Sequence, residues 1–147
     1  MDSSPEVTAR RAELERTAPV VPRGTWMRTR LGDAEVVFLC GTIGAEFDTW
    51  QRRLSALSAA DALLSQQIGL EAVEKVMDDL EKEAKVEVEA EGRKMLPRKS
   101  PGYGDLPIEL SRTILNELDA TRKIGVSITD SNLLVPSKSV TAICEIC

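Results

Sequence analysis

Histidine is absent from the 147 residues of the chain. The chain therefore lacks the commonest general base, the usual zinc ligand and any Ser-His or Cys-His nucleophile pair. The sequence also contains no GxGxxG motif, no Walker-type phosphate loop and no nucleophile elbow. We expect no hydrolase activity from this chain alone.

Aromatic residues are scarce, at 3% of the chain. This scarcity removes the stacking platforms on which single-stranded nucleic acids bind. The formal net charge is −5, whereas proteins that bind a phosphate backbone concentrate lysine and arginine. Both observations argue against a nucleic-acid partner.

Long apolar runs are missing as well. No stretch approaches the roughly 20 apolar residues that span a bilayer, and Met1 to Arg10 is polar, unlike a secretory leader. Three cysteines, an odd number, do not make a disulfide framework. We therefore expect a cytoplasmic protein with reduced thiols and no membrane partner.

Length and composition are ordinary for a soluble globular chain, with 42% hydrophobic and 29% charged residues. A chain of this length can bury one sizeable core but not two. We predict a single domain over residues 1–147, with a core of Leu, Ile, Val and Ala.

The first 43 residues predict a helix and two strands. A polar cap and a first-turn proline open the helix at Ser4-Pro5, and helix-favouring residues continue to Arg16. Residues 25–31 are extended, and the apolar, β-branched run at residues 35–43 predicts a buried strand.

Two helices are predicted next. Ser58 separates them as a cap, the second helix reaches about Lys85, and Gly69 is its expected weak point. The charged residues 81–94 are interpreted as a solvated surface. The apolar positions recur every three or four residues: Phe47, Trp50, Leu54, Leu57, Leu63, Leu64, Val73, Val76, Met77, Leu80 and Ala84.

The C-terminal third mixes loop, helix and strands. Apolar spacing predicts a helix over residues 110–118, and alternation predicts strands at residues 125–129 and 139–143, with turn residues at 130–132. Helices and strands do not alternate as regular βαβ units. We therefore predict the α+β class.

Residues 95–107 form a loop punctuated by three prolines and two glycines. Gly102 permits close approach of a ligand to the main chain, and Arg98 offers a fork of donors that matches a carboxylate. An amino-acid carboxylate is the predicted ligand group. The alternative is a rigid structural connector with a surface arginine.

Other groupings carry weaker signals. Cys144 and Cys147 have metal-site spacing, but without a second pair or histidines we favour a half-buried thiol and a frayed terminal one over a metal role. Cys40 is interpreted as a core residue. The acidic pairs, Asp78-Asp79 in particular, are interpreted as solvated helix faces rather than acid–base groups.

Three blocks, Arg98–Pro107, Ile124–Ser131 and Pro136–Val140, stand in an order that resembles the reactivation domain of cobalamin-dependent methionine synthase. Arg98-Lys-Ser-Pro-Gly-Tyr-Gly-Asp-Leu-Pro107 is similar to its R-x-x-x-G-Y-x-x-x-P signature. Ile124-Gly-Val-Ser-Ile-Thr-Asp-Ser131 resembles I-G-[VM]-x-[LI]-T-[ED]-S, and Pro136-Ser-Lys-Ser-Val140 resembles P-x-x-S-V. Residues 39–46 resemble a weaker strand-then-helix block.

The resemblance implies a C-shaped α+β domain, with helices around a central antiparallel sheet, that binds S-adenosylmethionine in a shallow site. Such a module serves reductive remethylation of cob(II)alamin, with cobalamin (vitamin B12) carried by a partner corrinoid-binding domain or protein and electrons from a flavodoxin-like donor. It is an accessory component of the methyltransferase rather than an independent enzyme.

The resemblance also assigns site residues. Arg98 would hold the methionyl carboxylate, Ser100 and Gly102 would supply main-chain contacts, and Tyr103 would face the corrinoid. Glu74 is the helix carboxylate expected at the ligand's amino group. No metal ligand and no catalytic residue is predicted.

Two departures from the family bear on this expectation. Glu109 stands where the full-length synthase commonly has a histidine. We also expect parts of the family's N- and C-terminal portions to be missing. The alternative function is a non-catalytic module that docks on a corrinoid protein without using S-adenosylmethionine.

Overall fold

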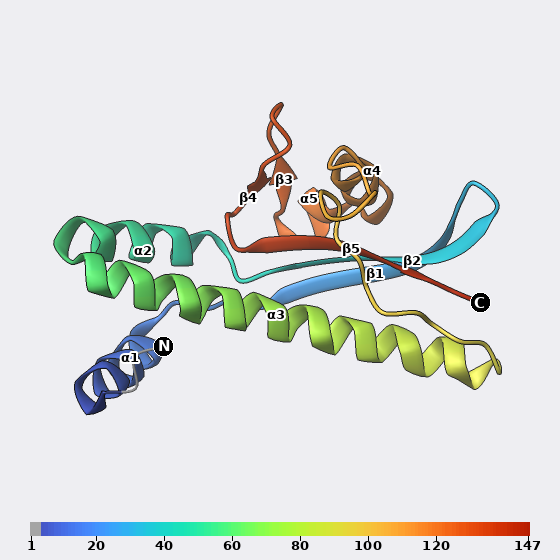
Figure 1. The fold of residues 1–147 in the computed structure, drawn as a ribbon. Coiled ribbons are helices and arrows are strands. Elements are labelled where there is room, and N and C mark those ends of the chain that lie inside the picture. Colours follow the sequence, from blue (N-terminus) through green and yellow to red (C-terminus); the bar gives the residue numbers. More distant parts are fainter. Residues whose placement is uncertain (1–3) are drawn as a thin grey trace.

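A computed structural model describes residues 4–147, so the first three residues of the polar start lie outside the described part. Figure 1 shows the arrangement of the elements. In chain order these are α1 (Pro5–Thr17), β1 (Arg23–Leu31), β2 (Ala34–Thr42), α2 (Ala45–Leu57), α3 (Ala59–Ala90), α4 (Leu110–Leu118), α5 (Ala120–Ile124), β3 (Ser127–Ile128), β4 (Leu134–Val135) and β5 (Ser139–Glu145).

The main sheet is antiparallel, in the order β1-β2-β5. A short hairpin of β3 and β4 stands apart from it. Residues 94–99 run along the outer edge of β5 and pair with it through bridges at Met95–Ile146 and Lys99–Ile143. The segment after α3 thereby becomes a fourth, irregular strand of the sheet.

Helices cover both faces of the sheet, with α3 on one side and α4 and α5 on the other (Figure 1). Along β2, Val37 and Leu39 face the cluster under α3, whereas Val36, Phe38 and Cys40 face the cluster under α4 and α5. Alternate residues point to opposite faces, so burial on both faces explains the uninterrupted apolar run.

Helix α3 is longer than predicted and runs without a break through Gly69. Its N-cap is Ser58, whose hydroxyl accepts a hydrogen bond from the Asp61 N–H at 3.2 Å, as expected of a polar cap. A Cβ at Gly69 would lie 2.6 Å from Cε1 of Phe47 on α2. The helix continues through Gly69, where the missing side chain admits the Phe47 ring, and the expected weakness of the helix at this glycine remains a prediction.

Two apolar positions of these helices do not belong to the core. Leu57 and Leu63 are largely exposed, whereas Phe47 and Val73 are fully buried. The exposed leucines flank the turn at Ser58, where the two helices meet at their tip. Within residues 4–147, no helix or strand covers them there.

The C-terminal third follows the prediction in part. The helix predicted at residues 110–118 is confirmed, and the final strand extends two residues beyond its expected end. The strand expected at residues 125–129 is reduced to Ser127–Ile128, and the helix α5 and the strand β4 were missed. Left-handed residues at Asp119 and Gly125 bound α5, leaving it too short for periodicity to reveal.

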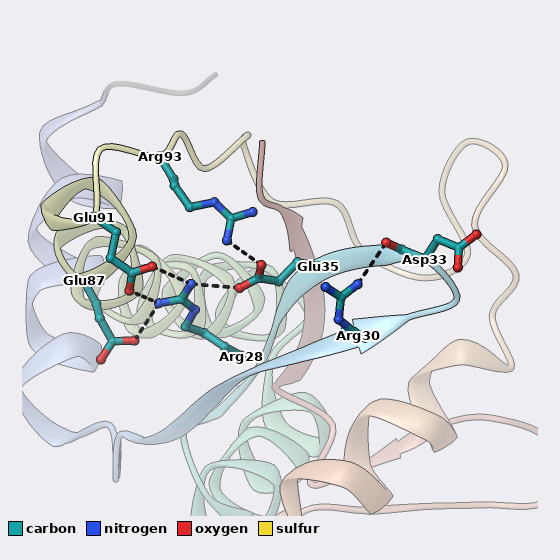
Figure 2. A network of polar contacts seen from close by, with 7 residues as sticks. All are labelled: Arg28, Arg30, Asp33, Glu35, Glu87, Glu91 and Arg93. Carbon is teal, nitrogen blue, oxygen red and sulfur yellow. Dashed lines mark hydrogen bonds and ion pairs between the residues drawn. The ribbon is translucent and has the colours of Figure 1, made fainter.

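A network of ion pairs fastens the end of α3 to the β1–β2 hairpin (Figure 2). Arg28 donates to Glu35 at 2.8 Å and to Glu91, and Arg93 donates to the second oxygen of Glu35. Hydrogen bonds from Arg93 and Arg28 hold the pKa of Glu35 below its usual value. The interpretation of residues 81–94 as merely solvated was therefore incomplete.

Although α3 has 32 residues, neither it nor any other helix within residues 4–147 is apolar enough over a sufficient length to cross a membrane.

Candidate functional site

A groove of about 720 Å³ lies between the N-terminal end of β5 and the loop that begins at Arg98. Helix α3 forms one wall, and the start of α4 with β4 forms the other, on the opposite side of the sheet (Figure 1). The lining residues are Leu70, Val73, Glu74, Arg98, Lys99, Ser100, Pro101, Tyr103, Gly104, Asp105, Ile108, Ser111, Asn132, Leu134, Ser139, Val140 and Thr141.

Arg98 is the most densely partnered charged group of the groove. Its guanidinium lies 2.6 Å from Glu74, 2.8 Å from Asp78 and 2.6 Å from Glu81, all on α3. Partial burial alone would lower the pKa of Arg98, but the hydrogen bonds that Arg98 donates to these three carboxylates more than offset this effect and raise that pKa. Arg98 is therefore a fixed cation with an 18% exposed side chain.

A change of register between residues 94–99 and β5 turns the Arg98 side chain toward α3. The main-chain N–H of Leu96 donates to the carbonyl of Glu145 at 2.9 Å. Lys99 and Ile143 exchange two main-chain hydrogen bonds, each of 2.9 Å. Pro97 and Arg98 together therefore stand opposite the single residue Cys144. Two residues opposite one make a β-bulge, a device that redirects side chains at the edge of a sheet.

Beyond Arg98 the loop tightens into consecutive turns. Tyr103 N–H donates to the Ser100 carbonyl at 3.3 Å, and Gly102 N–H donates to the Leu106 carbonyl at 3.0 Å. Gly102 has φ +91°, in the region that favours glycine. These turns leave Tyr103 on the surface with 77% of the residue exposed.

The structure brings four of the five predicted site residues into one groove: Glu74, Arg98, Ser100 and Tyr103. Gly102 is not among the lining residues. Gly102 is exposed, and a Cβ placed on it would make only ordinary contact with Ile108 at 3.6 Å. Close approach of a ligand to the Gly102 main chain remains a prediction.

Sequence reasoning missed two of the carboxylates around Arg98. Asp78 was assigned to a solvated face and Glu81 to a charged surface, yet both accept hydrogen bonds from Arg98. A signal was available, because residues 74, 78 and 81 are spaced by four and three and so share one helix face. Their shared partner lies 17 to 24 residues away in sequence.

The cysteines lie outside this chemistry. Burial raises the pKa of Cys40 and of Cys144 to about 12, while Cys147 is exposed. Among the described residues, no group of three His, Cys, Asp or Glu side chains could hold a metal ion. The buried interpretation of Cys40 is confirmed; Cys144 is more deeply buried than the half-buried thiol expected.

The fold matches that of a solved structure described as the MetH reactivation domain bound to AdoHcy, with a TM-score of 0.74. The two sequences are 16% identical, and the match covers 95% of this chain and 63% of the other. The chain thus spans less than two thirds of that structure. Comparisons with protein-family models and with curated proteins find no match.

The predicted α+β class, with helices around an antiparallel sheet, is confirmed by this likeness. The resemblance to the reactivation domain holds at the level of the fold.

Proposed function

We propose that this chain binds S-adenosylmethionine in the groove and serves the reductive remethylation of cob(II)alamin in a cytoplasmic cobalamin-dependent methionine synthase. The observation that carries the proposal is Arg98, held by three carboxylates on the wall of a groove in a reactivation-domain fold. Its partner would be the corrinoid-binding domain or protein, with a flavodoxin-like electron donor.

Each predicted residue has a role in this proposal. When Glu74 turns from Arg98 to bind the α-amino group, the side of the Arg98 guanidinium that it leaves binds the methionyl carboxylate. Main-chain groups at Ser100 and Gly102 position the ligand. The exposed Tyr103 faces the corrinoid of the partner.

The charge around Arg98 supports a cationic ligand. Three carboxylates surround one guanidinium, which leaves this corner of the groove with excess negative charge. The Glu74 side chain is 55% exposed and lines the groove, so it can turn from Arg98 toward an incoming ammonium. S-adenosylmethionine brings an ammonium and a sulfonium along with its carboxylate, and the two cations match this field.

The methyl donor and the corrinoid supply the group-transfer chemistry. The residues of this chain hold the donor in one orientation and shield its reacting end from water. No residue of the groove needs to act as an acid or a base in this scheme, in agreement with the absence of histidine.

Calorimetric titration of S-adenosylmethionine into the folded chain tests the proposal. Arg98→Ala should weaken binding by the roughly 1.5–3 kcal/mol of a charged hydrogen bond, or about ten- to 150-fold. Arg122→Ala is the matched control, since Arg122 is an exposed arginine of α5 whose one ion pair among residues 4–147 is with Asp119. Failure of the folded wild-type chain to bind would refute the proposal.

Glu74→Gln tests the charge argument separately. This change should weaken S-adenosylmethionine more than S-adenosylhomocysteine, because only the former carries the sulfonium charge. Asp79→Asn is the control, because Asp79 is an exposed α3 carboxylate that pairs with Lys75 and not with Arg98. Equal weakening of the two ligands would show that Glu74 does not sense the sulfonium.

The rival function is docking on a corrinoid protein without use of S-adenosylmethionine. The exposed Tyr103 and Ile108 at the groove favour it, since exposed apolar side chains beside a concave site suit a protein contact. This alternative would be supported if the folded chain bound a corrinoid protein but did not bind S-adenosylmethionine.

A further inference from the structure

Strand β1 ends the main sheet on the side away from β5, and its outer edge has no neighbouring strand among residues 4–147. Its residues Arg23–Leu31 pair with β2 one to one, without a bulge, and include no proline. Proteins usually protect an open edge with a short strand, a bulge, proline or charged side chains. Of these devices β1 has only charged side chains, so it keeps the geometry that accepts a further strand.

The pairing pattern defines which main-chain groups of β1 point outward. The Glu35 carbonyl accepts a hydrogen bond from the Ile146 N–H at 3.0 Å, so the odd-numbered residues of β2 face β5 and the even-numbered ones face β1. Their partners on β1 are the odd-numbered residues. The residues whose N–H and C=O point to the open edge are therefore Gly24, Trp26, Arg28 and Arg30.

The helices on the two faces of the sheet leave this edge accessible. Gly24 is exposed and residues 25–29 are all partly exposed, whereas β2 is buried from Val36 to Thr42. Because Gly24 has no side chain, its exposure is that of the main chain itself. Within residues 4–147, no hydrogen bond joins the outward N–H and C=O groups to another part of the chain.

Two arginines without carboxylate partners stand near the two ends of the edge. Arg23 and Arg30 are exposed, and neither forms an ion pair within the described part of the chain. Arg30 donates to the main-chain carbonyl of Asp33 at 3.2 Å, and the Asp33 carboxylate points away from it (Figure 2). Both positive charges are therefore available to an incoming group.

We propose that this edge binds an extended acidic segment of a partner protein, which adds to the sheet as an antiparallel strand. Main-chain hydrogen bonds to the open edge supply affinity, and carboxylates opposite Arg23 and Arg30 supply selectivity. The surface lies outside the groove, and the proposal does not depend on S-adenosylmethionine.

The positions of the two arginines define the segment. Arg23 and Arg30 are separated by seven positions, an odd number, so their side chains project from opposite faces of the sheet. The segment therefore carries Asp or Glu at two positions with the same separation. Between them, the partly exposed Trp26 and Met27 lie on the two faces and favour apolar partners.

The ion-pair network around Arg28 restricts the middle of the segment (Figure 2). Arg28 pairs with Glu35, Glu87 and Glu91, and Arg93 is the second cation of the network. Carboxylates therefore outnumber cations here. An acidic residue opposite Arg28 would be repelled, so the segment is uncharged at that position.

A second copy of this chain fits the edge less well. Antiparallel self-pairing about Met27 would bring Arg23 of one copy near Arg30 of the other at both ends of the pair. Each copy also carries a formal net charge of −5. Both features oppose association of two copies, whereas the same arginines attract an acidic strand.

A synthetic nine-residue peptide tests the proposal. It has Glu at its second and ninth positions, Val at its fifth and sixth, and Thr elsewhere. In antiparallel register the glutamates stand opposite Arg30 and Arg23, and the valines stand opposite Met27 and Trp26. Two-dimensional NMR of the folded 147-residue chain at low ionic strength should show saturable binding that slows exchange of the outward Trp26 amide at least tenfold.

Two sets of variants separate the main-chain and charge contributions. N-methylation of the fourth and sixth peptide residues, whose N–H groups face β1, should abolish binding, whereas N-methylation of the fifth and seventh should not. Glutamine in place of both glutamates, or the double variant Arg23→Gln with Arg30→Gln, should weaken binding at least fivefold. Arg53→Gln is the matched control, because Arg53 is an exposed arginine of α2, away from the edge.

Absence of binding at millimolar peptide, or equal binding of the glutamate and glutamine peptides, would overturn the proposal. A wild-type dimer in sedimentation analysis that protects the same amide would assign the edge to a second copy and overturn it too. The double variant should bind S-adenosylmethionine as the wild type does, so failure at this edge and failure at the groove are distinguishable.

Discussion

Replacing Arg98 with alanine should destabilise the protein even when no ligand is present. Arg98 joins the loop after α3 back to the middle of that helix through three carboxylates. Its removal leaves Glu74, Asp78 and Glu81 without their shared cation on one helix face. Like charges at these spacings repel one another.

The magnitude follows from the exposure of each pair. The contact with Glu81 is the most protected, because the Arg98 and Glu81 side chains are 18% and 24% exposed, and such a charged hydrogen bond contributes about 1.5–3 kcal/mol. The other two carboxylates are more than half exposed, so solvent screening limits each pair to about 0.2–1 kcal/mol. Allowing for rehydration of the freed carboxylates, we expect a net loss of about 2 kcal/mol.

Urea unfolding of a double-mutant cycle measures this coupling. The four proteins are the wild type, Arg98→Ala, Glu81→Gln and the double variant, and the expected coupling free energy is about 1–2 kcal/mol. Glu81→Gln should cost stability in the wild type and cost less, or restore stability, when Arg98 is absent. A loss under about 0.5 kcal/mol for Arg98→Ala, with no coupling to Glu81, would refute the reasoning.

Three further predictions concern the rest of the molecule. Gly69→Ala should lower the free energy of unfolding by about 1–3 kcal/mol through overpacking against Phe47, measured by urea unfolding; a gain of about 0.5–1 kcal/mol, as at an open helical glycine, would contradict the packing. Since the folded-state pKa of Glu35 is depressed, its stabilisation is complete above its unfolded pKa of about 4.3 and declines as pH falls through the lower folded pKa; unfolding midpoints between pH 6 and pH 3 should therefore depend on pH less steeply in Arg28→Ala than in the wild type, and parallel profiles would be the contrary result. Titration with a thiol reagent at pH 8 should modify Cys147 alone in the folded chain and three thiols in denaturant, because the other two are buried with raised pKa values; rapid reaction of more than one folded thiol would disprove this.

Local patterns in the sequence predicted most of the helices and long strands. Ser58 was identified as a helix cap because a cap depends on its own side chain and the next few residues. The buried strand β2 was identified because its apolar run is continuous. The packing role of Gly69 was not predicted because it depends on Phe47, a residue 22 positions earlier on another helix.

The site was predictable in its residues but not in its internal pairing. The loop chemistry and the resemblance identified Arg98, Ser100 and Tyr103, and all three line the groove. The bulge that turns Arg98 toward α3 depends on the register between residues 94–99 and β5, which only the folded sheet defines.

The most direct test of the central claim, that this groove binds S-adenosylmethionine, is a chemical-shift titration of the folded, isotope-labelled chain followed by two-dimensional NMR. We expect saturable shifts at Arg98, Ser100 and Tyr103, with none in the distant ion-pair network around Arg28 (Figure 2). A spectrum that stays unchanged at millimolar ligand, or shifts that cluster away from the groove, would contradict the account.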